Sequence, residues 1–447
     1  MSTFPAFFPR NFRKKYPEVV RAEGCYLHLS DGSKVLDAIG GAAVVSIGHG
    51  VKPVAQAMAE QAERACFAHT SEYHTPEAKQ LATRLRQLAP ANFHERGRVL
   101  FTSGGSEANE TAIKLVRKYW LDRGQPQRTR IVSRLMSYHG STLGALSLSG
   151  NLRRRRAYAP LLHEWGHIAP CFCYRCPLKK TYPDCNVACA DELERLIATD
   201  PTSIAAFIFE PVSGATLGAA VPPDGYAQRL AEICQRHGIL LIADEVMTGM
   251  GRTGKPFAVQ HWGIEPDIIV TGKGVASGYA PVGAVLAASH VVETIEKNSG
   301  AFEHGFTYMA HPVGMATAMA VLDFIEQNKL FERVAPMGRE LVASLGTLKK
   351  HRTVGDVRGL GLMAGIEFVK DVASKEPFAA DVHFAERFSE LTLEEGVATY
   401  PMKGCVDGDL GDHVLLAPPF TITSAQISEV TAGIDRALTR LEKELSL

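Results

Sequence analysis

The sequence predicts an α/β protein with a doubly wound, mostly parallel sheet and a second, smaller domain. The first observation is a pair of short, continuously apolar runs at residues 204–209 and 239–243, with a further strand-like run at residues 267–270. Such runs are typical of strands that are buried on both faces of a parallel sheet. The second is that strand-like runs alternate with helical patterns through residues 99–290, as in α/β domains. The third is that the chain becomes rich in helical patterns beyond about residue 327.

Length and charge limit the classes of function. A chain of 447 residues is long enough for two or more domains with large cores. The 48 basic and 48 acidic residues cancel, so no overall field attracts nucleic acid or an anionic membrane. No apolar run approaches the roughly 18 residues that span a bilayer. We therefore expect a cytoplasmic protein without nucleic-acid or membrane partners.

The N-terminal segment, residues 1–21, is basic and aromatic. It lacks the apolar core and cleavage site of a secretory signal, and it has no acidic residue before Glu18. An organelle transit peptide is therefore an open alternative. The favoured interpretation is an arm that packs Phe4, Phe7 and Phe8 on the body of the protein or on a partner.

Nine cysteines in a chain of this size indicate reduced thiols rather than a disulfide scaffold. Their main cluster could supply zinc ligands, but it lacks paired C-x2-C knuckles, and His167 is the only close histidine. We therefore expect a loop of free thiols and no metal, with a structural zinc site as the alternative. The cluster consists of Cys171, Cys173, Cys176, Cys185 and Cys189.

In chain order, the first elements are a small β unit at residues 25–37, a helix that starts near Pro53 and a helix over residues 76–88. A strand at residues 99–102 is followed by a glycine-serine turn and by a helix over residues 107–120. This arrangement points backbone N–H groups and a positive dipole end at a phosphate. The turn is Ser103-Gly104-Gly105-Ser106.

A further strand at residues 131–133 leads to Tyr138 and His139, where an aromatic ring could lie flat on a cofactor. Four consecutive arginines within residues 151–156 predict a solvated loop. The strand at residues 204–209 ends in Glu210. In the C-terminal part, strands are expected near residues 362–368 and 413–417.

Two charged residues end buried strands in the central part of the chain. Asp244 follows the strand at residues 239–243, and Lys273 follows the strand at residues 267–270. Open α/β sheets bind their ligands at such strand ends. A partly desolvated lysine can form a Schiff base, and an aspartate can keep a pyridinium nitrogen protonated. The pair is compatible with a pyridoxal phosphate site, and equally with an ordinary strand-end salt bridge.

Several further motifs favour the pyridoxal phosphate interpretation over the salt bridge. With these motifs in this order, the sequence resembles the class III (ω-amino) aminotransferases, which belong to the fold-type I pyridoxal phosphate enzymes. The resemblance covers nearly the whole chain. The matching motifs are Asp31-Gly32, Gly48-His49, the segment Ser103 to Asn109, Tyr138-His139-Gly140, Glu210-Pro211-Val212, Asp244-Glu245-Val246, Gly249 to Gly254, Lys273-Gly274, His304 to Tyr308, Val357-Arg358-Gly359 and Ala417-Pro418-Pro419.

The resemblance implies a role for individual residues. Lys273 would be the Schiff-base lysine, which also transfers protons, and Asp244 the partner of the pyridinium nitrogen. Tyr138 would stack on one face of the ring beside His139, with Val246 on the other face. The remaining implied cofactor residues are Gly105 and Ser106 at the phosphate, Glu210 near the ring, and Thr307, which would reach the phosphate in the neighbouring subunit of a homodimer.

The resemblance also implies a domain organisation. Residues 1–58 would form an N-terminal arm and part of the small domain. Residues 59–326 would form the large cofactor-binding α/β domain, and residues 327–447 the rest of the small α+β domain. The small domain would thus be built from both chain ends.

The reaction implied is transamination, with racemisation or an intramolecular amino shift as alternatives that share the same motifs. A P-loop nucleotidase is a remote alternative, since Gly249-x4-Gly254-Lys255 mimics a Walker A loop. The next residue is Pro256, which has no hydroxyl for Mg²⁺.

Substrate choice is expected to follow from three departures. Alanine, at Ala215, stands where glutamate-using relatives have a glutamate, and Met247 stands where they have glutamine. Residues 391–421 contain no arginine, and Lys403 is their only fixed cation. We therefore expect an amine or ω-amino acid donor, an apolar pocket near Ala43, Val45 and Tyr138, and pyruvate rather than 2-oxoglutarate as the acceptor.

Overall fold

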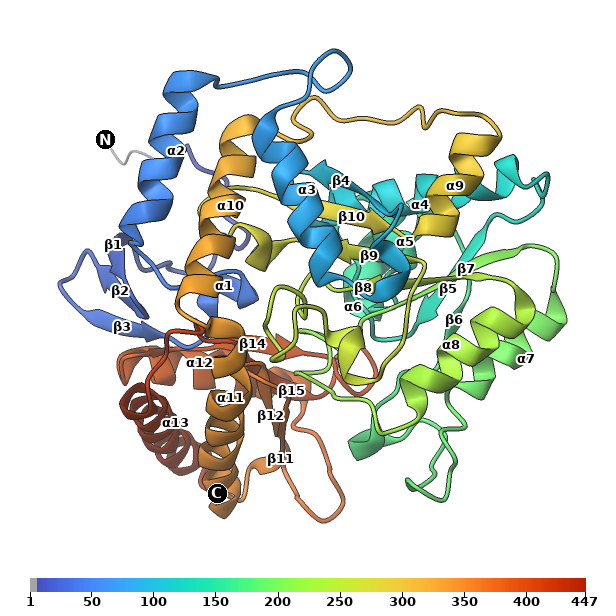
Figure 1. Ribbon diagram of the computed structural model, residues 1–447. Helices are drawn as coiled ribbons and strands as arrows, with labels where there is room; N and C mark the ends of the chain where they lie inside the picture. The colour runs from blue at the N-terminus through green and yellow to red at the C-terminus, as the bar shows by residue number, and fades with distance from the viewer. Residues whose placement is uncertain (1–5) are drawn as a thin grey trace.

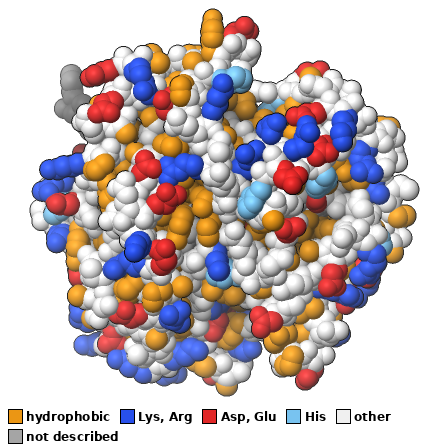
Figure 2. All heavy atoms as spheres, in the orientation of Figure 1, with side chains coloured by type: hydrophobic (Ala, Val, Ile, Leu, Met, Phe, Trp, Pro, Cys, Tyr) orange, Lys and Arg blue, Asp and Glu red, His pale blue; other side chains and the backbone are white. Residues whose placement is uncertain are grey.

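The computed structural model describes residues 6–447, in which helices surround three β-sheets. The N-terminal strands β1 to β3 lie beside the C-terminal elements α11 to α13, and the middle of the chain forms the rest of the molecule (Figure 1). None of the helices in residues 6–447 has the length and apolar character needed to cross a membrane. Basic and acidic side chains are interspersed on the face shown in Figure 2.

The largest sheet has seven strands in the order β4-β10-β9-β8-β7-β5-β6. Strand β10 pairs in antiparallel fashion with both β4 and β9, and the other neighbours are parallel. The sheet is therefore mostly parallel, as predicted. Its strands are β4 (Arg98–Thr102), β5 (Arg130–Arg134), β6 (His167–Ile168), β7 (Ile204–Phe209), β8 (Leu240–Asp244), β9 (Ile268–Thr271) and β10 (Gly283–Ala287).

Both faces of this sheet are covered by helices, which explains the continuous apolar runs. In β8, Leu241 and Ala243 belong to one hydrophobic core, and Ile242 belongs to a second core on the opposite face. Helices α3, α7, α8 and α10 contribute to the first core, and α4 and α9 to the second. The helices of this part are α3 (Pro76–Leu88), α4 (Gly105–Asp122), α5 (Leu143–Leu148), α6 (Leu152–Arg155), α7 (Asp191–Thr199), α8 (Tyr226–His237), α9 (Ser289–Lys297) and α10 (Pro312–Gln327).

A third core joins the two chain ends. Leu36 and Ile47 pack in it together with residues of the last hundred positions, such as Phe388 and Leu438. Two four-stranded sheets, β1-β2-β3-β13 and β11-β12-β15-β14, surround it. Its elements are β1 (Val19–Glu23), β2 (Tyr26–Leu29), β3 (Lys34–Asp37), α1 (Gly40–Ala43), α2 (Lys52–Arg64), α11 (Leu330–Gly346), β11 (Val354–Gly359), β12 (Ala364–Phe368), α12 (Phe384–Glu394), β13 (Val397–Ala398), β14 (Tyr400–Lys403), β15 (Asp412–Leu416) and α13 (Ser424–Glu444).

Helix α10 contacts both parts, with Met315 and Leu322 in the first core and Val321 and Ile325 in the third. The small part built from both chain ends agrees with the predicted fold class, whereas the boundaries at residues 58 and 326 stay predictions. Short 3₁₀ turns complete the chain: η1 (Ala91–Phe93), η2 (Arg156–Leu161), η3 (Cys173–Arg175), η4 (Ala258–His261), η5 (Lys273–Val275), η6 (Thr347–Lys350) and η7 (Ala380–Val382).

The prediction of a solvated loop at the four arginines is wrong. Residues 152–155 form helix α6, whose N-cap Asn151 accepts a hydrogen bond from the Arg154 backbone N–H. Arg155 is buried and donates to the carbonyls of Leu146, Ser147 and Ser149. These carbonyls lie at the C-terminal end of α5, where they have no N–H partner within the helix. Arg155 supplies the missing hydrogen-bond donors.

Phe7 and Phe8 of the predicted arm do not pack on the body of this chain, because their side chains are exposed. Phe4, the third aromatic residue of the predicted arm, lies outside the described residues. Packing of the arm on a partner stays a prediction.

Candidate active site

A cavity of about 170 Å³ opens where the parallel strands of the large sheet end. It gathers all the predicted site residues except Thr307. They come from the turn after β4, the loop after β5, and the ends of β7, β8 and β9, which is where open α/β sheets bind ligands. The lining residues are Gly105, Ser106, Tyr138, His139, Gly140, Glu210, Val212, Asp244, Val246, Met247 and Lys273.

Lys273 begins the turn η5 just after β9 and has a φ of 42°. This left-handed conformation is uncommon for a residue with a side chain and often marks a functional position. Burial of the charged amine lowers the pKa of Lys273 to about 8, against the opposing effect of Asp244 and Glu210. At pH 7 about one amine in ten is therefore neutral, far more than at the ordinary lysine pKa, and the neutral form is the one that acts as a nucleophile or proton acceptor.

Asp244 ends β8 and is only 4% exposed. One carboxylate oxygen lies 2.7 Å from His139 Nδ1 and accepts a hydrogen bond from Asn109 Nδ2 at 3.0 Å. The other accepts from the backbone N–H of Val246 at 3.1 Å. A buried carboxylate needs such partners, and they hold Asp244 at the cavity wall.

Gly105 and Ser106 stand at the start of the 18-residue helix α4. The N-cap residue, Gly104, provides no side-chain cap, so the first N–H groups are available to an anion. A Cβ atom on Gly105 would lie 2.8 Å from Val246 Cγ1, and only glycine permits this approach. Ser106 Oγ accepts a hydrogen bond from the Ser141 N–H at 3.1 Å.

Glu210 and Tyr138 are linked at the end of β7. Glu210 is buried, which raises the pKa of its carboxyl group. It accepts hydrogen bonds from the backbone N–H groups of Tyr138, at 3.4 Å, and Gly214, at 3.3 Å. The Tyr138 hydroxyl lies 2.8 Å from Ser141 Oγ, and the Ser141 N–H donates to Ser106 Oγ, so the loop after β5 is tied to the start of α4.

Thr307 does not line this cavity but lies in an exposed segment that precedes α10. The neighbouring Tyr308 is 62% exposed, and its ring centroid lies 6.0 Å from that of Phe67, which is also exposed. These residues form an apolar surface around Thr307.

Parts of the predicted substrate pocket lie elsewhere. Ala43 and Val45 are buried and do not line the cavity. The chain next to them is held by Ser277, whose Oγ accepts hydrogen bonds from the N–H groups of Ser46 and Ile47. Lys403 is bound to Glu386 at 2.8 Å and to His383 at 2.9 Å, away from the cavity lining.

Sequence reasoning missed several residues at the site. Val212 and Gly140, which the resemblance names only as motif positions, line the cavity, and Met247, which was expected to affect substrate choice, lines it as well. The position of Asn109, one turn after Gly105 on α4, was a usable signal, since such a residue faces the same side as the start of the helix. Arg154 is the least expected, because its guanidinium carbon lies 4.2 Å from the centroid of the Tyr138 ring.

The residues at this cavity fit pyridoxal 5'-phosphate. They provide a lysine amine, a fixed carboxylate for the ring nitrogen and a helix start for the phosphate. His139 Nε2 and Asn109 Oδ1 are also buried without a hydrogen-bond partner in the described part of the chain. Such groups are expected where a polar ligand supplies the missing contacts.

The Walker-like loop does not form a nucleotide site. Arg252, in its middle, is buried and donates to the carbonyls of Leu362 and Pro418. A Cβ atom on Gly251 would lie 2.5 Å from the ring of Phe331. The loop therefore packs against the small part of the protein instead of enclosing a phosphate.

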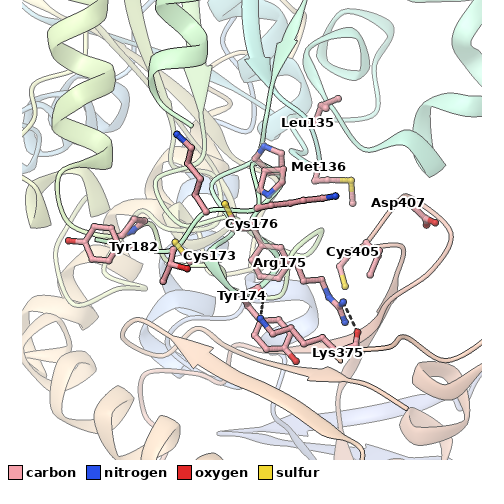
Figure 3. Close-up of a pocket in the computed structure, with 18 of the residues that line it drawn as sticks. Leu135, Met136, Cys173, Tyr174, Arg175, Cys176, Tyr182, Lys375, Cys405 and Asp407 are labelled. Carbon is pink, nitrogen blue, oxygen red and sulfur yellow. Dashed lines mark hydrogen bonds between the residues drawn. The ribbon is translucent and has the colours of Figure 1, made fainter. Parts of the chain in front are cut away.

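A larger surface cavity, of about 1100 Å³, lies over the cysteine-rich loop (Figure 3). Cys173 and Tyr182 line it from the loop, and Lys375 and Cys405 from the C-terminal part. All nine cysteines are free. In residues 6–447, no group of three or more His, Cys, Asp or Glu side chains is arranged to hold a metal ion.

Comparison with known proteins agrees with this geometry. The model of the family described as aminotransferase class-III matches residues 8–438. An uncharacterized aminotransferase of Schizosaccharomyces pombe is 40% identical over 95% of this chain and 92% of its own length. The putrescine–pyruvate aminotransferase of Pseudomonas aeruginosa is 34% identical, over 92% of this chain and 88% of its own.

Among solved structures, an amine transaminase from an uncultivated Pseudomonas species, in its pyridoxal phosphate-bound form, superimposes with a TM-score of 0.90 and 35% identity. The match covers 98% of this chain and 99% of that one. The chain therefore belongs to the class III aminotransferases, a family of pyridoxal phosphate-dependent transaminases with the type I fold.

Proposed function

We propose that this protein moves an amino group from an amine or ω-amino acid to a keto acid, with pyruvate preferred over 2-oxoglutarate. The observation that carries the proposal is the placement of the Lys273 amine and the buried Asp244 carboxylate in one cavity with a helix start. Bound there, pyridoxal phosphate would supply an aldehyde that takes up the amino group and a ring that accepts electrons.

In this proposal each residue has one task. Lys273 would hold the cofactor through its amine and would move a proton to and from the substrate carbon, a task that the lowered pKa of this amine favours. Asp244 keeps the ring nitrogen protonated. Gly105 and Ser106 bind the phosphate, and Tyr138 and Val246 enclose the ring. Residues with supporting tasks are Glu210 and His139.

We also propose a homodimer in which Thr307 binds the phosphate of the other subunit's cofactor. The exposed position of Thr307 supports this, as do the apolar side chains beside it, because exposed apolar surface is typical of protein contacts. We further propose that this homodimer acts in the cytoplasm.

The apolar wall of the cavity supports the substrate preference. Met247, Val212 and Val246 line it together. Ala215 is buried in an apolar cluster with Val212, Met363 and Leu415. A relative that is named as a pyruvate aminotransferase supports pyruvate as the acceptor.

A half-reaction screen tests the substrate preference. The absorbance of the bound cofactor is followed after addition of a monoamine, an ω-amino acid or glutamate, one at a time. We expect faster conversion by the monoamine and the ω-amino acid than by glutamate, and faster recovery with pyruvate than with 2-oxoglutarate. Product analysis distinguishes transamination from racemisation or an amino shift. Fastest conversion by glutamate would contradict the proposal.

The phosphate site can be tested with Ser106→Glu. The new carboxylate would face the bound phosphate, and like charges about 4 Å apart repel by ~4 kcal/mol at an effective dielectric constant of about 20. We expect cofactor dissociation, measured by dialysis and absorbance, to increase by at least about tenfold.

Ser106→Gln is the matched control, because it adds the same bulk without charge. The control should retain the cofactor better than the glutamate variant. Equal retention by both variants would show that the phosphate binds elsewhere.

A further inference from the structure

The four consecutive arginines have four different environments. Arg155 binds carbonyls at the end of α5, and Arg156 forms an ion pair with Asp409 at 2.6 Å. Arg153 is exposed. Arg154 is half-buried, and its guanidinium lies over the Tyr138 ring. In residues 6–447 this guanidinium forms no hydrogen bond and no ion pair, so its donors are available to a ligand.

Arg154 lies beside the active site. It contacts Tyr138, which lines the cofactor cavity. Its positive charge is close enough to Lys273 to contribute to the lowered pKa of that amine. Arg154 also lines a second cavity of about 360 Å³, together with Asn151, Arg153, Glu386, Pro401, Met402 and Lys403.

The other cations near the site are already engaged. Lys403 is bound to Glu386 and His383. Arg252 is bound to the carbonyls of Leu362 and Pro418. Arg134 donates to the Glu210 carbonyl, and Arg358 binds carbonyls after β7 and the carboxylates of Asp356 and Glu367. In residues 6–447 the guanidinium of Arg153 also lacks such partners, but of the two Arg154 is the one that lies over the Tyr138 ring.

We propose that Arg154 binds the carboxylate of the substrate, namely that of the keto acid and of an ω-amino acid donor. This inference rests on the proposed function, in which one substrate always carries a carboxylate and the amine donor need not. A guanidinium binds a carboxylate at two points. When the substrate is an amine without a carboxylate, the Arg154 guanidinium can stay in its cation–π contact with the Tyr138 ring.

The test compares Arg154→Leu with the wild-type holoenzyme in single-turnover half-reactions. Butylamine and 4-aminobutyrate form a matched pair, because they share four carbons and a terminal amine and differ in the carboxylate. We expect the variant to lose on the order of 10–100-fold in efficiency with 4-aminobutyrate and with pyruvate, mainly through weaker binding. Butylamine should react within about threefold of the wild-type rate.

Butanoate provides a readout without turnover. It carries the carboxylate but no amine, so it should perturb the absorbance of the bound cofactor without reacting. Its dissociation constant should rise in Arg154→Leu by a factor similar to that for 4-aminobutyrate. Arg154→Lys should restore part of the affinity, since lysine keeps the charge but not the two-point contact.

Arg156→Leu is the matched control, because it removes the same charge two positions away, from an exposed residue that lines neither cavity. It should leave all three substrates and butanoate unchanged. Equal losses for butylamine and 4-aminobutyrate in Arg154→Leu would show that Arg154 only supports the Tyr138 ring, and would overturn the proposal. Unchanged butanoate binding would do the same. A wild-type enzyme that converts no amine donor would contradict the proposed function, and the butanoate measurement would still decide the role of Arg154.

Discussion

Replacing Lys273 with arginine is expected to reduce turnover by at least 10²–10⁴-fold, on the order of what proton transfer by a positioned side chain contributes. Arginine keeps the positive charge, but it stays protonated and cannot bond to the cofactor aldehyde or accept the substrate proton. The measurement is the steady-state rate, together with borohydride reduction and mass analysis. Reduction should attach the cofactor covalently to Lys273 in the wild-type protein and to no residue in the variant.

Lys255→Arg is the control for this prediction. Lys255 is an exposed lysine that directly follows the loop from Gly249 to Gly254, and it does not line the cavity. Its replacement should change neither the rate nor the covalent attachment. A Lys273→Arg protein that still transaminates would assign the chemistry to a different lysine.

Replacing Asp244 with asparagine is expected to lower turnover by about a thousandfold while the cofactor remains bound. A charge pair about 4 Å apart at an effective dielectric constant of about 20 is worth ~4 kcal/mol, and each 1.36 kcal/mol corresponds to about tenfold in rate. Asparagine has nearly the same shape, but it has no charge with which to keep the ring nitrogen protonated. The measurements are turnover and the absorbance of the bound cofactor.

Glu245→Gln is the matched control, because Glu245 is the adjacent, fully buried acid. Burial raises the pKa of Glu245 to about 7, and its carboxylate accepts a hydrogen bond from the Val259 N–H instead of lining the cavity. The control should keep near-normal turnover. A near-normal rate in Asp244→Asn as well would assign Asp244 a purely structural role.

The large sheet could be predicted from the sequence because its signal is local. In β7 and β8 every residue is buried, and a run of five or six apolar residues in the sequence predicts a strand buried on both faces. The strand-turn-helix unit around Gly105 was equally local. The short strands β13 and β14 were not predicted, since two to four residues carry little pattern and their pairing depends on distant partners.

The site was predictable where a residue ends a strand, as Asp244 and Lys273 do. It was not predictable where orientation depends on tertiary contacts. Within residues 151–156, four consecutive arginines cannot be told apart from the sequence. In the structure Asn151 caps a short helix, in which Arg155 is buried and Arg154 lies over the Tyr138 ring. Similarly, Ala43 and Val45 were expected at the pocket, but the adjacent Ser46 and Ile47 are fixed by Ser277.

The parallel pairing of β3 with β13 has a consequence for how the protein folds during synthesis. Leu36 pairs with Val397, about 360 positions later. The N-terminal strands leave the ribosome early, and the edge of β3 stays unpaired until nearly the whole chain has been made. Contacts of such long sequence separation form slowly, and unpaired strand edges favour aggregation. We infer that the large sheet folds first and that chaperones which shield exposed strands act on the nascent N-terminal segment.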